Sequence, residues 1–228
     1  MNLIQKQIID LLNASIHNTV PKLDYSKGVD WDEVINESNA HSIIGLIYPA
    51  LKNIKDNNID KEIIDKLKKY VPDEFNTYYE PFVGGGALLF ELSPKNAVIN
   101  DSNKELMNVY ECIKDEKKFE AMCRELNNHE MKHSEEYYYT IRNMDRDKKK
   151  FNKVEDYKRA ARTIYLNKAC FNGLYRVNSK NEFNVPFGKK TKVNTYEGQN
   201  LGIICGFLNY NDIKILSTDF EEAVKEAK

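Results

Sequence analysis

The sequence predicts an α/β fold with a doubly wound sheet, and three observations lead to this prediction. A short stretch of aromatic and β-branched residues ends at three consecutive glycines, 84–86, and an apolar, helix-like stretch follows them directly. A second apolar strand, 97–99, runs into Asn100 and Asp101, and a third strand-like run covers 213–216 after several helical segments. Strands that alternate with helices, with glycines in the first turn, are typical of parallel strands covered by helices.

The pattern of apolar residues divides the chain into four regions. A helical N-terminal segment precedes the first part of the α/β domain, a helical insertion follows, and the chain then returns to the α/β domain. The predicted regions are 1–70, 71–115, 116–200 and 201–228. Within the first region, apolar residues at helical spacing predict helices over 2–18 and 30–70.

Further helices are predicted after the second strand. Ser102 can cap a helix over 103–114. The remaining helices are expected at 116–128, 135–147, 154–170 and 197–209, with a closing helix from Phe220. The 154–170 helix has one apolar side, and Arg159, Arg162 and Lys168 lie off it. Strand-like residues around the polar turn 178–181 predict a β-hairpin on the insertion.

The composition indicates a soluble globular protein. Hydrophobic residues make up 41% of the chain and charged residues 30%, and no apolar run approaches the roughly 20 residues that span a bilayer. The N-terminus lacks the basic and apolar regions of a signal peptide, so we expect a cytoplasmic location and no membrane partner. The four cysteines have no C-x-x-C spacing and the four histidines do not pair with them, which predicts reduced thiols and no metal site.

The net charge of −1 hides a strong asymmetry. Residues 141–192 contain 15 Lys and Arg against 5 Asp and Glu, a net charge of +10, so the rest of the chain carries −11. A basic segment on an acidic body indicates a surface for a polyanion. A solvated helical face is the alternative explanation for this charge.

The glycine turn suits a nucleoside ligand better than one with phosphates. It lacks the G-x-G-x-x-G form of dinucleotide loops, has no Lys or Arg to pair with a phosphate, and follows Glu80. An acid on the first strand favours a ligand with a positive amino or sulfonium group. Asp101 lies at the spacing at which nucleotide-binding folds place an acid under ribose hydroxyls. S-adenosylmethionine carries all of these groups, and an ordinary strand–turn–helix corner is the alternative.

Two blocks of sequence resemble one family. The first joins E-P-F-V-G-G-G at 80–86 to N-D at 100–101, and the second joins N-G-L-Y-R-V-N at 172–178 to F-N-V-P-F-G at 183–188. Through these blocks, of which the second is the more specific, the chain from about 66 to 228 resembles the Dam-like (D12 class) adenine-specific DNA N6-methyltransferases. The resemblance implies a Rossmann-like S-adenosylmethionine-dependent methyltransferase fold, incomplete in this chain, with a helical insertion that bears the hairpin.

The resemblance also implies a binding site for S-adenosylmethionine at the ends of the strands. Its residues would surround the methionine part of the cofactor, accept hydrogen bonds from the ribose and face the adenine ring. They are Glu80, Pro81, Phe82, Gly84 and Gly86 for the methionine part, Asp101 for the ribose, and Asp219 and Phe220 for the adenine. A plain N-cap of the last helix is a compatible role for Asp219.

By the same resemblance, double-stranded DNA would bind the insertion. Arg176 would read a guanine edge, because a guanidinium can bond O6 and N7 together. Phe171 and Asn172 would push out the target adenine and fill the gap, because an amine inside a base pair cannot be reached. The full predicted set of DNA-binding residues is Phe171, Asn172, Leu174, Arg176, Asn178, Pro186 and Lys189.

The remaining DNA contacts are of a more general kind. Leu174 and Pro186 would contact thymine methyl groups or pack beside bases, and Lys189 would chiefly contact phosphates. The usual target of the family predicts GATC as the recognition sequence. An ordinary polar turn is the alternative explanation for the hairpin.

The catalytic motif of the family, Asp-Pro-Pro-Tyr, is absent from these 228 residues, since no two of the six prolines are adjacent. We therefore assign no catalytic residue. We expect a truncated chain that is inactive by itself, from a family that serves DNA methylation and restriction–modification. Two alternatives stay open: a non-catalytic DNA-binding module, and one subunit of a split methyltransferase whose second polypeptide supplies the missing motif.

Overall fold

The chain forms two compact units in the computed structural model. The structure describes residues 3–16, 33–34, 68, 71–72, 74–196 and 198–227. The first unit comprises Met1–Asn76 and Gly84–Leu92, and the second comprises Thr77–Val83 and Ser93–Lys228. Among the described residues, no helix combines the length and the apolar character needed to cross a membrane.

The first unit contains two described helices, α1 (Leu3–Ile16) and α5 (Ala87–Leu92). Leu11 of α1 and Leu89 of α5 are fully buried. The prediction of a helix at the N-terminus is confirmed by α1. The helix predicted over 30–70 lies outside the described residues, except at 33–34 and 68.

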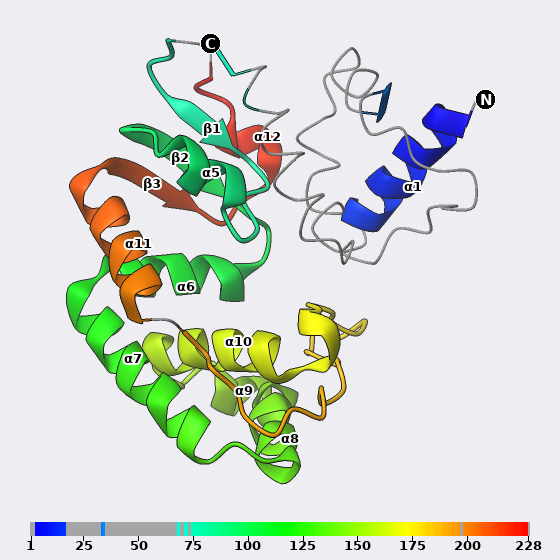
Figure 1. The fold of residues 1–228 in the computed structure, drawn as a ribbon, viewed down its shortest axis with the longest axis vertical. Coiled ribbons are helices and arrows are strands. Elements are labelled where there is room, and N and C mark those ends of the chain that lie inside the picture. Colours follow the sequence, from blue (N-terminus) through cyan, green and yellow to red (C-terminus); the bar gives the residue numbers. More distant parts are fainter. Residues whose placement is uncertain are drawn as a thin grey trace. The chain divides into compact units, whose positions relative to one another are not determined.

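Three parallel strands form the sheet of the second unit (Figure 1). They are β1 (Tyr78–Glu80), β2 (Asn96–Asn100) and β3 (Asp212–Leu216), in the order β1-β2-β3. The middle strand β2 is buried from Ala97 onward, as expected for a strand with a neighbour on each side. The three predicted strands are therefore confirmed, within a mixed α/β structure. Because the strands are parallel, all three end at the same edge of the sheet.

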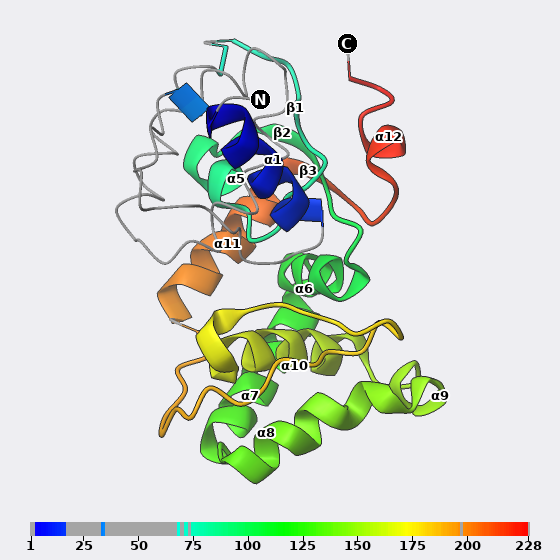
Figure 2. The same ribbon diagram turned by 90° about the vertical axis from the view of Figure 1, so that its right-hand side faces the viewer.

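Helices occupy most of the chain between β2 and β3, and a short helix follows β3 (Figure 2). The elements are α6 (Lys104–Lys114), α7 (Glu116–Met131), α8 (Glu135–Arg142), the 3-10 turn η2 (Asn143–Arg146), α9 (Lys148–Phe151), α10 (Asp156–Ala169), the 3-10 turn η3 (Phe171–Gly173), α11 (Gly198–Tyr210) and α12 (Phe220–Ala223).

Two of these helices differ from the predicted ones. Asn103, not Ser102, caps α6, because its Oδ1 accepts the backbone N–H groups of Glu105 and Leu106. The helix predicted over 135–147 ends earlier, at Arg142. Asp147 leaves the helical conformation and caps the separate helix α9.

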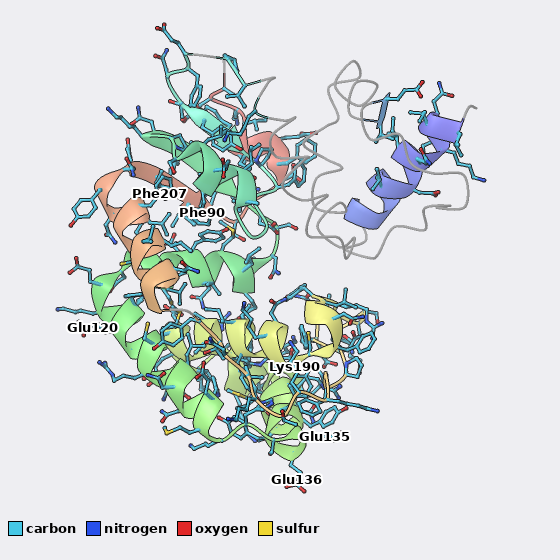
Figure 3. The ribbon with its side chains drawn as sticks, in the orientation of Figure 1. Phe90, Glu120, Glu135, Glu136, Lys190 and Phe207 are labelled. Atoms are coloured by element: carbon cyan, nitrogen blue, oxygen red, sulfur yellow. The ribbon has the colours of Figure 1, made fainter. Side chains whose placement is uncertain are left out.

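The aromatic core of the second unit lies between α8, α10 and the chain that follows η3 (Figure 3). Tyr138 is fully buried and donates a hydrogen bond of 2.8 Å to the carbonyl of Val185. The backbone N–H of Gly188 bonds the carbonyl oxygen of Ala169 at 2.9 Å. A Cβ at Gly188 would lie 2.7 Å from that oxygen, closer than side chains approach, so only glycine fits here.

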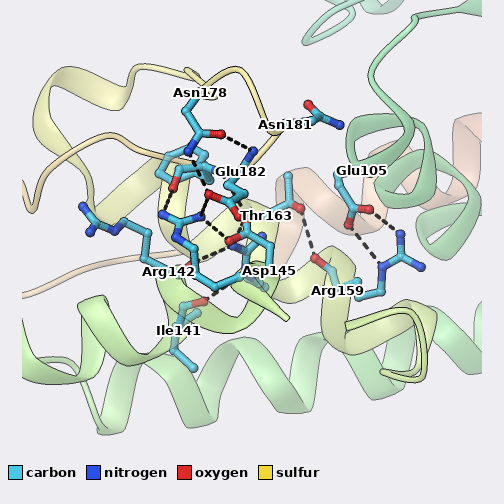
Figure 4. Close-up of polar contacts among 12 residues, drawn as sticks. Glu105, Ile141, Arg142, Asp145, Arg159, Thr163, Asn178, Asn181 and Glu182 are labelled. Atoms are coloured by element: carbon cyan, nitrogen blue, oxygen red, sulfur yellow. Dashed lines mark hydrogen bonds and ion pairs between the residues drawn. The ribbon is translucent and has the colours of Figure 1, made fainter. Parts of the chain in front are cut away.

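A buried ion cluster joins η2, α10 and the chain around Phe183 (Figure 4). Asp145 and Arg162 are 4% and 3% exposed, and Arg162 Nη2 lies 2.9 Å from Asp145 Oδ2. The same carboxylate oxygen accepts the N–H of Phe183 at 2.8 Å, and Arg146 donates to the Phe183 carbonyl at 2.6 Å. Although Arg162 lies off the apolar side of its helix in the sequence pattern, it is buried, because Asp145 supplies a counter-ion there.

Asp145→Asn is expected to lower the free energy of unfolding by about 3–5 kcal/mol, because it leaves the Arg162 guanidinium buried without a counter-ion. Chemical denaturation near neutral pH measures this change. Glu120→Gln is the matched control, since Glu120 and its partner Arg124 are 73% and 70% exposed. The control should stay within about 0.5 kcal/mol of the parent. Equal losses in the two variants would contradict a special role for the buried cluster.

His129 on α7 is buried in a ring of aromatic side chains. Its Nδ1 lies 2.8 Å from the hydroxyl of Tyr137, and its ring stacks on Tyr165 with 4.9 Å between centroids. Among the described residues, its Nε2 has no hydrogen-bond partner. Burial lowers the pKa of His129 from 6.5 to about 4, against a smaller opposing effect of Glu125. The folded chain therefore holds this imidazole neutral at pH 7.

His129→Phe is expected to make stability less sensitive to acid. The unfolded chain protonates His129 below pH 6.5 and the folded chain only below about 4. The contribution of His129 is thus intact above pH 6.5 and is lost as the pH falls through this window, at up to about 1.4 kcal/mol per pH unit. Thermal unfolding at pH 7 and pH 5 should show a smaller loss of Tm in the variant than in the parent. An equal loss in both proteins would refute this assignment.

Candidate functional site

The side-chain amide of Asn100 joins the ends of all three strands. Its Nδ2 donates to the carbonyl oxygens of Pro81 (3.1 Å) and Thr218 (3.2 Å), and its Oδ1 accepts the N–H of Thr218 (2.9 Å). Its own carbonyl accepts the N–H of Val83 at 2.9 Å. Asn100 is 1% exposed. Its amide therefore supplies the hydrogen bonds that water would otherwise make to the backbone groups at this edge of the sheet. Sequence reasoning assigned it no role, although a polar residue at the end of an apolar strand was a usable signal.

Two carboxylates lie at the same edge. Glu80, at the end of β1, is buried and accepts a hydrogen bond of 3.0 Å from the hydroxyl of Tyr78. Asp101, directly after β2, is half-buried, and its Oδ1 accepts the N–H of Asn103 at 2.9 Å. The pKa of Tyr110 on α6 lies well above its usual range. Burial is the largest cause, and the negative charges of Glu80 and Asp101 raise this pKa further. The edge is therefore electronegative.

Aromatic rings adjoin these carboxylates. The rings of Phe82 and Phe220 lie 5.6 Å apart between centroids, with 33° between their planes, and Phe220 is 45% exposed. Asp219 caps α12, because its Oδ1 accepts the N–H of Glu221 at 3.0 Å. The alternative prediction of an N-cap at Asp219 is confirmed. The cap uses only Oδ1 of Asp219, so the predicted contact of its carboxylate with a ligand is compatible with the cap.

The predicted glycine positions belong to the first unit. Gly84 and Gly86 have φ angles of +49° and +70°, which non-glycine residues rarely adopt. An added Cβ at Gly84 would meet nothing within 4 Å. The backbone conformation, rather than lack of space, therefore favours glycine there.

The edge of the sheet has a donor set that fits S-adenosylmethionine. Residues 77–83, 98–103 and 217–220 contain carboxylates and aromatic rings but no Lys or Arg. Carboxylates complement an amino or sulfonium cation and ribose hydroxyls, whereas phosphates would need basic side chains. The chemistry of these residues fits the predicted cofactor better than a phosphorylated nucleotide.

The chain from Phe171 to Lys189, called the 171–189 loop below, folds back on itself without regular strands. Among the described residues of this loop, only isolated bridges are formed, between Val177 and Phe183 and from Phe187 to Cys170. The predicted β-hairpin is therefore present only as a turn with hairpin-like bonds. Its extension is limited because Pro186 has no N–H to donate and turn side chains occupy neighbouring backbone groups.

Five of the seven predicted DNA-binding residues are exposed on this loop. They are Phe171, Asn172, Arg176, Pro186 and Lys189. Leu174 is half-buried against the aromatic core. Asn172 and Lys189 have φ angles of +58° and +55°, so the loop turns sharply on both sides of the Arg176 segment.

The guanidinium of Arg176 is held by one neighbour across the loop. Its Nε donates to Asn184 Oδ1 at 2.7 Å and its Nη2 to the Asn184 carbonyl at 3.4 Å. The backbone of the two residues is also joined, since the N–H of Asn184 bonds the Arg176 carbonyl at 3.0 Å. The Nη1 group takes part in none of these bonds. The outer side of the guanidinium thus keeps donors for a two-point contact.

Asn178 has a local role in the turn. Its Oδ1 accepts the N–H groups of Lys180 and Glu182, each at 3.0 Å, and its Nδ2 donates to Glu182 Oε2 at 2.8 Å. All polar atoms of its side chain are therefore used within the turn. Its contact with DNA stays a prediction. Such a contact would require Asn178 to exchange one of these hydrogen bonds within the turn for a bond to DNA.

Within 141–192, arginines and lysines differ in whether their charge is paired inside the unit or exposed on the surface. Arg146, Arg159 and Arg162 pair with carboxylates inside the unit, Arg159 with Glu105. The exposed positive charges are mainly lysines: Lys148, Lys149, Lys150, Lys153, Lys168, Lys180, Lys189, Lys190 and Lys192. Lys148 donates to the carbonyl of Asn181 at 3.0 Å, so α9 adjoins the tip of the 171–189 loop. Only part of the charge excess is therefore available to a polyanion.

Comparison with known proteins identifies relatives of the chain. The family model of the D12 class N6 adenine-specific DNA methyltransferases matches residues 61–228. Type II methyltransferase M1.LlaDCHI of Lactococcus lactis subsp. cremoris is 45% identical over 168 residues, which cover 74% of this chain and 58% of the relative. Type II methyltransferase M.MjaIII of Methanocaldococcus jannaschii is 37% identical over 174 residues, covering 70% and 59%.

A further relative is the DNA adenine methylase of Escherichia coli K12, which is 34% identical over 134 residues that cover 57% of this chain and 45% of the relative. The chain thus spans less than two thirds of the length of each of these relatives. The family model covers most of the chain, including both the strand edge and the 171–189 loop. The chain belongs to the D12 class of N6 adenine-specific DNA methyltransferases.

Proposed function

We propose that this chain serves the transfer of a methyl group from S-adenosylmethionine to the N6 amine of adenine at GATC sites in double-stranded DNA. The exposed 171–189 loop, with the guanidinium of Arg176 held by Asn184, is the observation that carries this proposal. One of the relatives is named a DNA adenine methylase. In this proposal the sheet is the Rossmann-like part of a methyltransferase, and residues 116–200 are its helical DNA-recognition insertion.

The cofactor would bind at the strand edge. Glu80, Pro81 and Phe82 would hold its methionine part. Asp101 would accept hydrogen bonds from the ribose, and its bond from the N–H of Asn103 fixes one carboxylate oxygen for this task. Asp219 and Phe220 would face the adenine. When bound, S-adenosylmethionine supplies a methyl group on a sulfonium centre.

DNA would bind across the 171–189 loop and the surrounding lysines. Arg176 would read a guanine through two N–H donors, while the exposed lysines neutralise phosphates without reading sequence. Phe171, which is 51% exposed, and Asn172 would fill the space left by the flipped adenine. Leu174, Pro186 and Lys189 would complete the contact.

A second candidate function is that of a DNA-binding module without turnover. The exposed lysines around the 171–189 loop favour it, because they can neutralise phosphates without a cofactor. Binding by such a module would be salt-sensitive and unaffected by the cofactor. The described residues give no separate support for a second polypeptide that completes the site.

We expect the 228-residue polypeptide to bind duplex DNA without transferring label from S-adenosylmethionine, because Asp-Pro-Pro-Tyr is absent from its sequence. Methyl transfer from labelled cofactor to duplexes with and without GATC measures this, beside binding to the same duplexes. Label on the GATC duplex alone would contradict the expected inactivity and establish the full activity. Failure to bind any duplex would count against the proposed function.

Arg176→Ala is expected to weaken binding to the GATC duplex by about 1–3 kcal/mol and to relax the preference at one base pair. The change removes both donors to the guanine edge. Arg124→Ala on α7 is the control, because this exposed arginine is remote in sequence from the loop and should leave binding unchanged. Equal losses for Arg176→Ala on every duplex sequence would show that Arg176 reads no base.

A further inference from the structure

We propose that Tyr175 is a positioning residue that couples DNA binding on the 171–189 loop to cofactor binding at the strand edge, through the N-cap of α6. The inference rests on the proposed function and deepens it. Tyr175 stands between Leu174 and Arg176 in the sequence, and its hydroxyl donates to Asn103 Oδ1 at 3.2 Å. Asn103 in turn donates its backbone N–H to Asp101.

The Asn103 side chain is shared by competing donors. Its Oδ1 accepts the N–H of Glu105 at 3.2 Å, the N–H of Leu106 at 3.3 Å and the Tyr175 hydroxyl at 3.2 Å. An amide oxygen has two lone pairs, so three donors cannot all bond it at full strength. The distances lie at the long end of the usual range, as expected for sharing. A change at the Tyr175 hydroxyl must therefore alter the cap of α6.

Tyr175 is anchored well enough to transmit a movement of the loop. Its ring packs edge-on against Phe183 with 5.6 Å between centroids, and the backbone of Phe183 is clamped by Asp145 and Arg146. Burial raises the pKa of Tyr175 to about 12, against the smaller effect of its bond to Asn103. The hydroxyl thus stays protonated and remains a donor at any working pH.

The cap lies on a helix that is held at both ends. Glu105, in the first turn of α6, pairs with Arg159 of α10, and Lys114, in the last turn, donates to the carbonyl of Ile213 in β3 at 2.6 Å. A helix fixed in this way cannot follow the loop as a rigid body. A change at Tyr175 is therefore taken up locally by Asn103 and by the adjoining carboxylate of Asp101.

Coupling of this kind must be reciprocal. If DNA changes the affinity for the cofactor by some factor, the cofactor changes the affinity for DNA by the same factor. A contact that only stabilised the fold would alter each affinity or the folded population, but not the ratio of affinities with and without the other ligand. We call the ratio of a ligand's Kd without and with the other ligand the coupling factor. A change in this factor distinguishes a positioning residue from one that only supports the fold.

The test uses the 228-residue chain, S-adenosylhomocysteine as an unreactive cofactor analogue, and a duplex containing GATC. Calorimetry gives the Kd of each ligand with and without saturating amounts of the other. We expect a coupling factor of about fivefold or more in the parent. Tyr175→Phe, which keeps the ring and removes the hydroxyl, should lower that factor by at least about twofold, towards the value of one that means no coupling. The Kd of each ligand alone should change by less than about twofold, given that the packing is unchanged.

Tyr196→Phe is the matched control. It removes a hydroxyl that donates to Asn127 Oδ1 at 3.3 Å, a bond of similar length that involves neither ligand site. Its coupling factor should equal that of the parent. A second readout needs no cofactor: duplex binding should alter amide hydrogen exchange at Glu105 and Leu106 in the parent but not in Tyr175→Phe.

The outcomes distinguish this inference from the proposed function. Loss of coupling in Tyr175→Phe alone, together with loss of the exchange response, supports it. Equal coupling in Tyr175→Phe and the parent overturns it and leaves the proposed function standing. Absence of duplex or analogue binding in the parent overturns both.

Discussion

The buried ion pair between Arg162 and Asp145 fixes the 171–189 loop to its helices. Both charges are removed from water, which is costly, so every remaining donor and acceptor must be satisfied. Arg162 also donates to the carbonyls of Ile141 and Arg142, and Asp145 also accepts from Arg146 and from the N–H of Phe183. A hydrophobic pair of the same size could match its stability but could not orient a backbone segment. The loop keeps its shape without a regular strand ladder because these side chains bind its backbone.

The strand edge is ordered by a neutral side chain. The Asn100 amide connects the chain after β1 with the chain after β3, so the segments that carry Glu80, Asp101 and Phe220 are held by one residue. A neutral amide does this without adding charge beside two carboxylates. The electronegative character of the edge is thus preserved for a cationic ligand.

The distribution of arginine and lysine separates structural from surface roles. A planar guanidinium with several donors suits the buried positions, where Arg162 binds a carboxylate and two backbone carbonyls. The strongly hydrated ammonium groups of the lysines remain on the surface, as suits non-specific phosphate contacts. Arg176 is the exception in the 171–189 loop, an exposed arginine whose orientation is set by Asn184.

Much of the fold and the family could be predicted from the sequence, because these features have local signals. The strand before the glycine turn, the strand that ends at Asn100, the helices with apolar periodicity and the motif around Arg176 all depend on neighbours in the chain. The burial of Arg162, the linking role of Asn100 and the bond from Tyr175 to Asn103 were decided only by the tertiary structure. Each depends on a partner far away in the sequence. The residues next to a polar side chain in the chain do not predict which distant residue it will bond.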